Sequence, residues 1–346
     1  MHQKALKNRS IVGGKPASPT EPSTRRLKTK LDVSEPLCED RVCCSRCTVE
    51  LLFAIGLNML DSMLLGALAA LSLGTSDFLA RFTSLRLGAA GAYTYVVVFG
   101  ALLMTVFIFA TGVELRFNAP GTVLAALHGL FVAAMSLMLY AALARGPISL
   151  AVPIVAAHPV LVLLYDFAIG ASQLSFQQTL AAAIVVLGVI AASLFSFHGE
   201  GQQQYSTGRG GTLLLALGAS IAYALLIVSG QAAAAEIGQT GATWLGRLTS
   251  AAILLLALAI GAFKLRRPAG SAPTLMAQGL LDTLGYVALL AGGLTLFPSI
   301  TAVVGSGFGF LTIVLARLII KEQVKVAQWV AVMVSFGGIA WLAYGQ

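Results

Sequence analysis

Long apolar runs recur along the chain, and they constrain its fold more than any other feature. From residue 62 onward each run is about 20 residues long, the length that an α-helix needs to cross a hydrocarbon core of about 30 Å. The runs are continuous and rich in Leu and Ala, without the period-two alternation of a membrane β-barrel. The sequence therefore predicts an all-α membrane protein with ten transmembrane helices, at residues 62–80, 91–110, 120–142, 148–169, 178–197, 211–231, 243–263, 275–292, 298–320 and 325–344.

Composition supports a membrane protein. Hydrophobic residues make up 58% of the chain and charged residues only 10%, whereas a soluble domain carries roughly 25% charged residues. The net charge is +8, but outside the first 46 residues the Lys and Arg residues are mostly single charges at the ends of apolar runs. This distribution is typical of loops between spans and not of a nucleic-acid-binding face, so the expected partner is the lipid bilayer.

Residues 1–58 differ in composition from the rest, being rich in Pro, Ser, Thr and basic residues. They predict a disordered basic tail, or upstream sequence translated from an early start codon, with Met59 or Met63 as the beginning of the membrane part. No apolar signal-peptide region precedes the first span. The tail holds all four cysteines of the chain, which lack the two C-x₂-C pairs of a zinc ribbon, so no metal site is expected at Cys38, Cys43, Cys44 and Cys47.

An internal repeat divides the ten spans into two halves, residues 62–198 and residues 210–346. Residues 150 positions apart match through successive spans: Gly129 and Gly279, Ser149 and Ser299, Gln178 and Gln328, Gly188 and Gly338. Each half holds five helices, and because five is odd, the second half enters the membrane in the opposite sense. This arrangement is an inverted repeat, common among secondary transporters that work by alternating access.

Two stretches carry a family resemblance. The segment 141–159, AALARGPISLAVPIVAAHP, and the segment 315–322, LARLIIKE, followed by Gln328, Gly337 and Gly338, resemble the signatures of EamA domains. Over about residues 62–344 the chain is similar to ten-helix members of the drug/metabolite transporter superfamily. The resemblance implies transport of amino acids, other metabolites or toxic compounds, often as export and often proton-linked.

The chain also departs from the pattern of that family. The glutamate expected before the fifth helix is Ser172 here, so only the second repeat keeps it, as Glu322. Near the end of the first span, Asp77 stands where a neutral amide is more typical. The basic C-terminal tail of many members is missing.

Ionisable residues within spans are few, and such residues usually face the bundle interior because charge at mid-bilayer is costly. Asp282, near the middle of the eighth span, suits a proton-coupling residue, since a carboxylate in a cavity can take up and release a proton. An equally weighted alternative is a structural ion pair with Arg247 of the seventh span.

Two further polar residues have simpler explanations beside the functional one. Asp77 precedes Arg81 by one helical turn, so a local ion pair explains it without function. His128 lies at the position that matches Gln278 in the second repeat, and the two could line one cavity. A hydrogen bond between helices is the favoured interpretation of His128.

Helix-breaking residues indicate where a central site lies. The fourth span contains Pro153 and Pro159, and its repeat mate, the ninth, contains Gly305 and Gly309. Interruptions at corresponding positions of two repeats point to a binding site, and carbonyl groups freed by the prolines could face solute. Close helix packing is the alternative for the two glycines. The aromatic residues expected to contribute to the cavity wall are Tyr140, Tyr223 and Tyr286.

No P-loop, dinucleotide-binding glycine pattern or HExxH motif occurs, so no catalytic residue, cofactor or metal is expected. The sequence predicts a multi-pass secondary transporter of the plasma (inner) membrane that exports small solutes and is coupled to protons. The alternatives are a non-transporting receptor or scaffold and a membrane enzyme acting on lipid-linked substrates. Substrate, oligomeric state and direction stay open.

The orientation also stays open at this stage. Nine Lys or Arg residues lie in the connections after the odd-numbered spans, and one lies in the others, which places both termini outside. The basic tail and the family resemblance place the termini inside.

Overall fold

The computed structural model describes residues 41–170, 175–197, 209–293, 295 and 298–344, and within these ranges the chain is helical with short connections. The helices are α1 (Arg41–Leu87), α2 (Ala89–Thr111), α3 (Ala119–Arg145), α4 (Ile148–Ala156), α5 (His158–Ala168), α6 (Phe176–Phe197), α7 (Arg209–Ile237), α8 (Gln239–Ala259), α9 (Ala272–Gly293), α10 (Pro298–Gly305), α11 (Phe308–Leu315), a π-helical turn η3 (Ala316–Ile320) and α12 (Val326–Tyr344).

The ten predicted spans correspond to these helices. Eight segments are long and apolar enough to cross a membrane, counting α4 with α5 and the end of α10 with α11 and η3 as single crossings. Helices α9 and α12 complete the ten. The prediction of an all-α protein with two five-helix halves is therefore confirmed.

The N-terminal part was only partly anticipated. Helix α1 begins at Arg41, so residues 41–58 are helical, which corrects the prediction of disorder there. The bundle is one compact unit that begins at Phe53, and the described residues of α1 before it, up to Leu52, belong to another unit. Cys38 and the rest of residues 1–40 lie outside the described residues. Among the residues that are described, no group of His, Cys, Asp and Glu is arranged to hold a metal ion.

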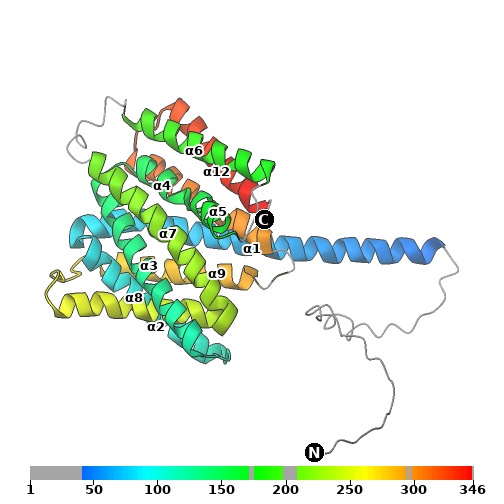
Figure 1. Ribbon diagram of the computed structural model, residues 1–346, viewed down its shortest axis with the longest axis horizontal. Coiled ribbons are helices and arrows are strands. Elements are labelled where there is room, and N and C mark those ends of the chain that lie inside the picture. Colours follow the sequence, from blue (N-terminus) through cyan, green and yellow to red (C-terminus); the bar gives the residue numbers. More distant parts are fainter. Residues whose placement is uncertain (1–40, 171–174, 198–208, 294, 296–297, 345–346) are drawn as a thin grey trace, which may run out of the picture. The chain divides into compact units, whose positions relative to one another are not determined.

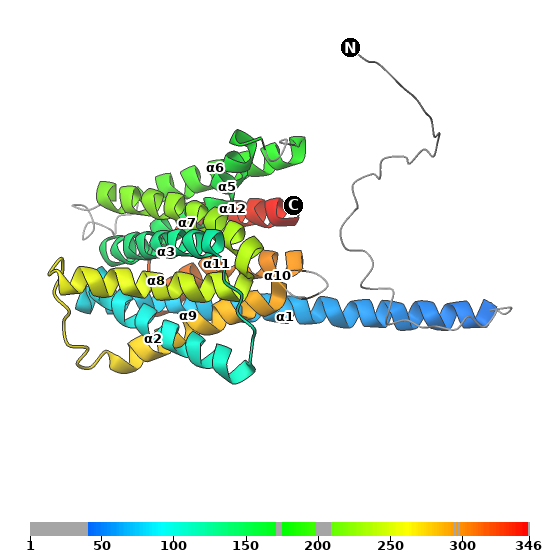
Figure 2. The same cartoon turned by 60° about the horizontal axis from the view of Figure 1, so that its bottom comes forward.

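Within the bundle, α6 and α12 pack together on one side, α3 and α7 lie in the middle, and α2, α8 and α9 form the opposite side (Figures 1 and 2). Large apolar side chains cover the outside, with Phe109 78%, Phe176 82% and Ile260 74% exposed. Such exposure would be unfavourable in water, whereas lipid tails accept it.

The repeat is visible in the helix contacts. A Cβ added at Gly129 of α3 would meet Gly246 and Thr249 of α8, and a Cβ added at Gly279 of α9 would meet Val96 and Phe99 of α2. The two contacts involve the same positions 150 residues apart. The pair α6 and α12 repeats in the same way, because Gly188 adjoins Ser335 and Gly338 adjoins Val185. The glycines that precede α2 and α8, Gly88 and Gly238, share φ values of 79° and 80°.

Alanine substitution is expected to affect the two repeat-related glycines unequally. The added Cβ of Gly129→Ala would meet the backbone oxygen of Gly246, which cannot move aside, and we expect a loss of about 1–3 kcal/mol. The added Cβ of Gly279→Ala would meet the Phe99 ring at 2.8 Å, which can turn, so the loss should be smaller. Thermal unfolding of both variants in detergent checks this, and equal losses would contradict it.

Two matched spans are broken at corresponding places. Helix α4 ends at Ala156 and α5 begins at His158, while α10 ends at Gly305 and α11 begins at Phe308. The N-terminus of α4 is held by Glu322, which follows η3 in the second repeat. The Glu322 carboxylate accepts hydrogen bonds from the backbone N–H groups of Ile148 (3.1 Å) and Ser149 (3.0 Å) and from the Ser149 hydroxyl. These N–H groups have no partner within the helix, so the carboxylate satisfies and charge-stabilises them.

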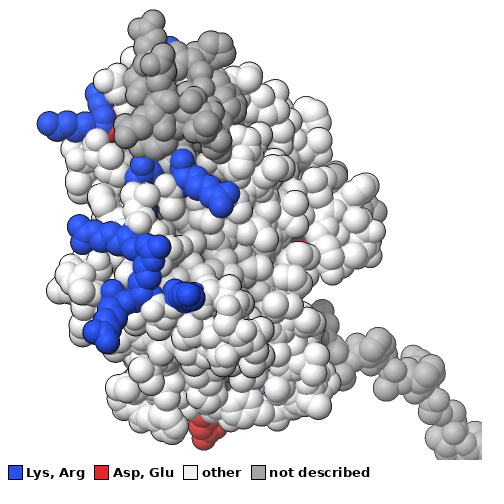
Figure 3. Space-filling view, turned by 90° about the vertical axis from the view of Figure 1, so that its left-hand side faces the viewer, with Lys and Arg blue, Asp and Glu red and all other residues white. Residues whose placement is uncertain are grey.

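Basic residues gather at one end of the bundle, where α1 meets α2, α3 meets α4, α8 meets α9 and η3 meets α12. Figure 3 shows this face with many Lys and Arg side chains and few acidic ones in view. The Arg266 guanidinium donates to the Arg86 carbonyl oxygen at 3.2 Å, joining two of these connections. The charge asymmetry found in the sequence is thus concentrated on one surface.

Candidate functional site

Two adjoining chambers lie at the centre of the bundle. The larger, of about 50 Å³, is lined by Leu73, Asp77, Tyr93, Met135, Ser136, Leu139, Tyr140, Val152, Val155, Tyr223, Asp282, Tyr286 and Phe308. The smaller, of about 20 Å³, is lined by Tyr93, Val97, His128, Val132, Ser136, Thr243, Arg247, Asp282 and Tyr286. The four residues common to both linings show that the chambers share a wall, formed by Tyr93, Ser136, Asp282 and Tyr286.

The smaller chamber is lined mainly by matching positions of the two repeats. Eight of its nine lining residues form pairs 150 positions apart: Tyr93 and Thr243, Val97 and Arg247, Val132 and Asp282, Ser136 and Tyr286. Matching positions that surround one space must lie around the pseudo-two-fold axis. In a carrier with inverted repeats, that axis is where the solute site is expected.

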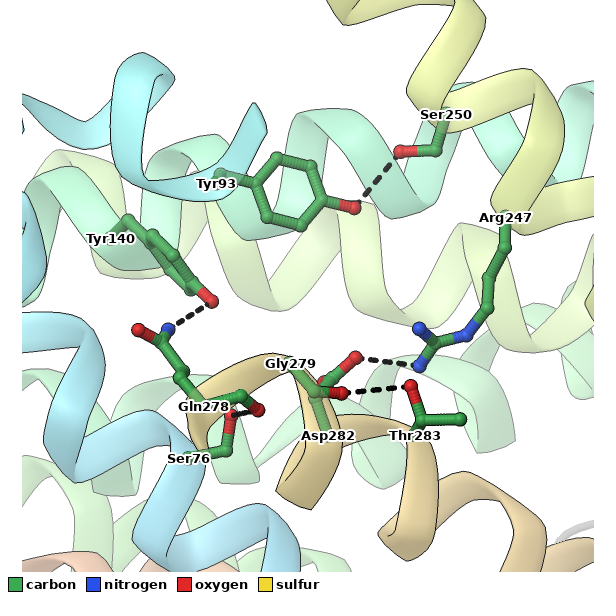
Figure 4. Close-up of polar contacts among 9 residues, drawn as sticks. All are labelled: Ser76, Tyr93, Tyr140, Arg247, Ser250, Gln278, Gly279, Asp282 and Thr283. Carbon is green, nitrogen blue, oxygen red and sulfur yellow. Dashed lines mark hydrogen bonds and ion pairs between the residues drawn. The ribbon is translucent and has the colours of Figure 1, made fainter. Parts of the chain in front are cut away.

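Arg247 of α8, which lines the smaller chamber, forms an ion pair with Asp282 of α9 in the shared wall. Nη2 of Arg247 donates to Oδ2 of Asp282 at 2.6 Å (Figure 4), with the two side chains 6% and 25% exposed. The guanidinium also lies over the Tyr286 ring, 4.5 Å from its centroid, a geometry that favours a cation–π interaction. Its Nε has no hydrogen-bond partner among the described residues. The pairing considered from the sequence is therefore present, and it leaves one buried donor unused.

A glycine on α2 leaves room for this arginine. A Cβ added at Gly100 would lie 2.5 Å from Nη1 of Arg247 and 3.0 Å from Oγ1 of Thr283. The first contact is shorter than real Cβ contacts and the second is tight, so a side chain at position 100 would force the Arg247 guanidinium to shift. Gly100 is a positioning residue that the sequence analysis did not identify.

Gly100→Ala is accordingly expected to disturb the site more than the fold. The guanidinium is the flexible end of a long side chain and can shift, so we expect a stability loss of about 1 kcal/mol, at the low end for overpacking. Solute affinity should fall more than this loss suggests. Binding and thermal unfolding of Gly100→Ala, compared with Gly91→Ala on the same helix, separate the two effects.

Asp77 of α1 lines the larger chamber, but its predicted local partner lies elsewhere. The Arg81 guanidinium donates to the carbonyl oxygens of Leu143 (2.8 Å) and Gly146 (2.6 Å), at the end of α3. Within the described residues, no ion pair or hydrogen bond reaches the Asp77 side chain. The explanation of Asp77 as half of an i,i+4 pair is therefore wrong, and its carboxylate faces the chamber without a protein counter-ion.

His128 and Gln278 occupy matching positions, but only His128 lines a chamber. Nδ1 of His128 lies 2.7 Å from the carbonyl oxygen of Leu226, which makes the inter-helix hydrogen bond favoured from the sequence. Gln278 is fully buried, where its Nε2 donates to Tyr140 Oη at 2.6 Å and its Oε1 accepts from Thr83 at 2.9 Å. The idea that both line one cavity is therefore wrong for Gln278, which orients Tyr140 instead.

Aromatic rings supply much of the larger chamber. All three tyrosines expected there, Tyr140, Tyr223 and Tyr286, line it, and Tyr93 and Phe308 join them. The Tyr93 hydroxyl pairs with Ser250 Oγ at 2.9 Å (Figure 4). The His158 ring stacks on Tyr223, with centroids 3.8 Å apart. These contacts fix the directions in which the rings point.

The proline and glycine positions serve packing in this structure. Pro153 is buried within α4 and Pro159 is partly buried at the start of α5, and neither lines a chamber, although Val152 and Val155 beside Pro153 do. Pro159 leaves the Val155 carbonyl oxygen without its helical N–H donor, and Nδ1 of His158 lies 3.1 Å from that oxygen. The Ser149 carbonyl oxygen, left free by Pro153, is 3.5 Å from Nε2 of Gln328. The expectation that these carbonyl groups face solute is thus wrong.

The two glycines of the ninth span are also packing residues. A Cβ at Gly305 would meet Leu289 of α9, and one at Gly309 would meet Val152 of α4 and Phe336 of α12. Gly309 lets the two broken spans cross closely, which brings Phe308 to the chamber wall. The sequence placed the site between these spans, whereas most of the lining comes from α1, α2, α3, α8 and α9.

Comparison with known proteins assigns the chain to a family. The EamA-like transporter family matches twice, over residues 61–194 and 211–344. The chain belongs to the EamA-like transporter family. The two EamA matches cover the two halves of the bundle, whose helices meet around the chambers.

A solved structure supports the same architecture. The chain is similar to one titled "Crystal structure of protein", with a TM-score of 0.57 and 16% identity over 81% of this chain and 96% of that one. At this identity the likeness shows the shared fold alone. No curated protein sequence matches the chain. Because EamA-like proteins are transporters, this chain is an integral multi-pass membrane transporter.

Besides Gly100, sequence reasoning missed four residues that shape the site. They are Ser136 and Tyr93 in the shared wall, Phe308 in the larger chamber and His158 behind Tyr223. The repeat relates two of them to the second half: Ser136 lies 150 positions before Tyr286, and Tyr93 lies 150 before Thr243. Mapping the candidate Tyr286 back onto the first EamA repeat would have found Ser136, whereas Thr243 was not a candidate and so gave no pointer to Tyr93.

Proposed function

We propose that this EamA-like protein is a secondary carrier that exports small polar or amphipathic metabolites by alternating access, coupled to protons through Asp282. The observation that carries the proposal is the smaller chamber, surrounded by four pairs of repeat-related residues. A space on the pseudo-two-fold axis keeps the same neighbours when the two halves exchange conformations, so solute bound there is reached from each side in turn.

The ion pair supports coupling at the same place. Asp282 lines both chambers and binds Arg247, so a change in its protonation alters the shared wall directly. A protonated Asp282 would weaken its hold on Arg247 and let the guanidinium move. Proton binding and helix rearrangement are thereby linked through one contact.

Transport into and out of proteoliposomes tests this function. Vesicles loaded with a mixture of amino acids and other polar metabolites are given a pH gradient, and released solutes are identified by mass spectrometry. We expect gradient-driven release with the native chain and with Asp166→Asn, a carboxylate on α5 that lines neither chamber. Asp282→Asn should lose the response to the gradient and keep solute exchange at equal pH, because the amide cannot titrate yet still accepts from Arg247.

The outcomes separate the parts of the proposal. Gradient-driven release by Asp282→Asn at the native rate would rule out coupling through this carboxylate. Absence of flux and exchange for every solute, with the protein folded, would favour a receptor or scaffold.

We also propose that the basic end of the bundle faces the cytoplasm, because short loops rich in Lys and Arg stay on that side. The bundle contains no native cysteine, so single cysteines report its orientation once the four near the N-terminus are changed to serine. On intact cells, a membrane-impermeant maleimide should label Glu114→Cys, at the opposite end, and spare Ala269→Cys, at the basic end. The reverse pattern would place the basic end outside.

A further inference from the structure

The acidic and basic side chains around the two chambers are unequal in number. Two carboxylates, Asp77 and Asp282, line the larger chamber, and one guanidinium, Arg247, is available to them. Arg247 is engaged by Asp282 at 2.6 Å. Asp77 therefore lacks a counter-ion within the described residues, in a part of the bundle where an unpaired charge is costly.

The surroundings of Asp77 suit a positive group that needs few hydrogen bonds. Five aromatic residues line the same chamber: Tyr93, Tyr140, Tyr223, Tyr286 and Phe308. The Tyr93 hydroxyl is paired with Ser250 and the Tyr140 hydroxyl with Gln278, so these two residues offer the chamber mainly their rings. Aromatic faces attract cations and provide the usual wall for alkylammonium groups.

Tyr286 shows that the chamber already uses this kind of interaction, because one cation, Arg247, lies 4.5 Å from its centroid. The His158 ring stacks on the Tyr223 ring and restricts its orientation. The chamber volume of about 50 Å³ exceeds the roughly 10–15 Å³ that a cavity needs to hold one water. There is room for a head group of a few heavy atoms.

We propose that the larger chamber binds the head group of a small organic cation, an alkylammonium, with Asp77 as its counter-ion and the tyrosine and phenylalanine rings as its wall. This inference rests on the proposed carrier function and names the substrate class. A bound cation neutralises Asp77, and the Arg247–Asp282 pair stays intact beside it. An anion would instead meet the unpaired carboxylate of Asp77.

Three probes of nearly one shape test the role of charge. Tetramethylammonium carries only the cation, glycine betaine is the same cation with a carboxylate on one methyl group, and 3,3-dimethylbutyrate replaces the nitrogen of betaine by carbon. Binding of radiolabelled tetramethylammonium to the purified full chain in nanodiscs is measured, with the other two as competitors. We expect tetramethylammonium to bind tightest, betaine to compete about tenfold or more weakly, and 3,3-dimethylbutyrate not to compete.

Variants test the role of Asp77. Asp77→Asn should weaken tetramethylammonium binding by about tenfold or more, and Asp166→Asn should leave it unchanged. If Asp77→Asn does not fold, the order of the three probes on the native chain still decides. Equal binding by a folded Asp77→Asn, tighter binding of betaine, competition by 3,3-dimethylbutyrate, or no binding of tetramethylammonium at millimolar concentration would each overturn the proposal.

This experiment separates the inference from the carrier function on which it rests. A protein that carries other solutes in the proteoliposome assay and does not bind tetramethylammonium remains a carrier with another substrate class. A protein that binds tetramethylammonium through Asp77 but exchanges no solute across the vesicle membrane supports the cation site and contradicts the carrier.

Discussion

Arg247→Leu is expected to lower the free energy of unfolding by about 3–5 kcal/mol, since it leaves Asp282 without its partner near the middle of the bundle. Asp282→Leu should cost a similar amount, because it strands a guanidinium that is only 6% exposed. The double variant Arg247→Leu/Asp282→Leu should recover most of the loss, since no uncompensated charge remains.

The measurement is thermal or denaturant unfolding of the four proteins in one detergent. If the loss in the free energy of unfolding of the double variant equalled the sum of the two single losses, the two residues would not act as a pair. The double variant should be stable and unresponsive to a pH gradient, because it folds without the proposed coupling group. Stability and function are thus expected to separate in this one protein.

Glu322→Ala is expected to cost about 2–3 kcal/mol, because its carboxylate accepts from two backbone N–H groups and one hydroxyl at the N-terminus of α4. Glu322→Gln keeps one acceptor oxygen and should cost about half as much. The matched control is Glu236→Ala, whose exposed carboxylate accepts from the Asn118 side chain at 2.9 Å and whose loss should be about 0.5 kcal/mol.

Unfolding measurements rank these three variants. Faster hydrogen exchange at the N–H groups of Ile148 and Ser149 should accompany Glu322→Ala, since they lose their acceptor. An unchanged exchange rate would mean that water replaces the carboxylate without cost. Because Glu322 belongs to the second repeat and α4 to the first, this contact also ties the two halves together at one end.

The features that the sequence predicted well depend on the bilayer. Helix number and length follow from the thickness of the hydrocarbon core, and the repeat follows from matches 150 residues apart. The Arg247–Asp282 pair could be suggested because a charge within a span needs a partner and few candidates exist. These arguments require no knowledge of how any helix is rotated.

The features that the sequence did not predict depend on rotation and on tertiary acceptors. Arg81 lies one turn from Asp77, but its guanidinium donates to carbonyl groups at the end of α3 instead. Local sequence spacing does not reveal these acceptors, which come from another helix. In the same way, Pro159 was expected to leave a carbonyl oxygen free for solute, but the His158 ring lies within hydrogen-bond distance of that oxygen, which belongs to Val155. Gly100 has no recognisable motif, since its role appears only when α8 approaches α2.

The pairing of residues around the smaller chamber has a kinetic consequence. Packing follows the repeat, but charge does not. The positions that match Arg247 and Asp282 in the first repeat are Val97 and Val132, which are uncharged. When the halves exchange conformations, the backbone outlines interchange while the charged side chains stay with one half. The solute then meets a different electrostatic environment from each side, so half-saturation concentrations measured from the two faces should differ. Without a coupling ion, this inequality is offset by unequal turnover rates, and solute concentrations still equalise across the membrane.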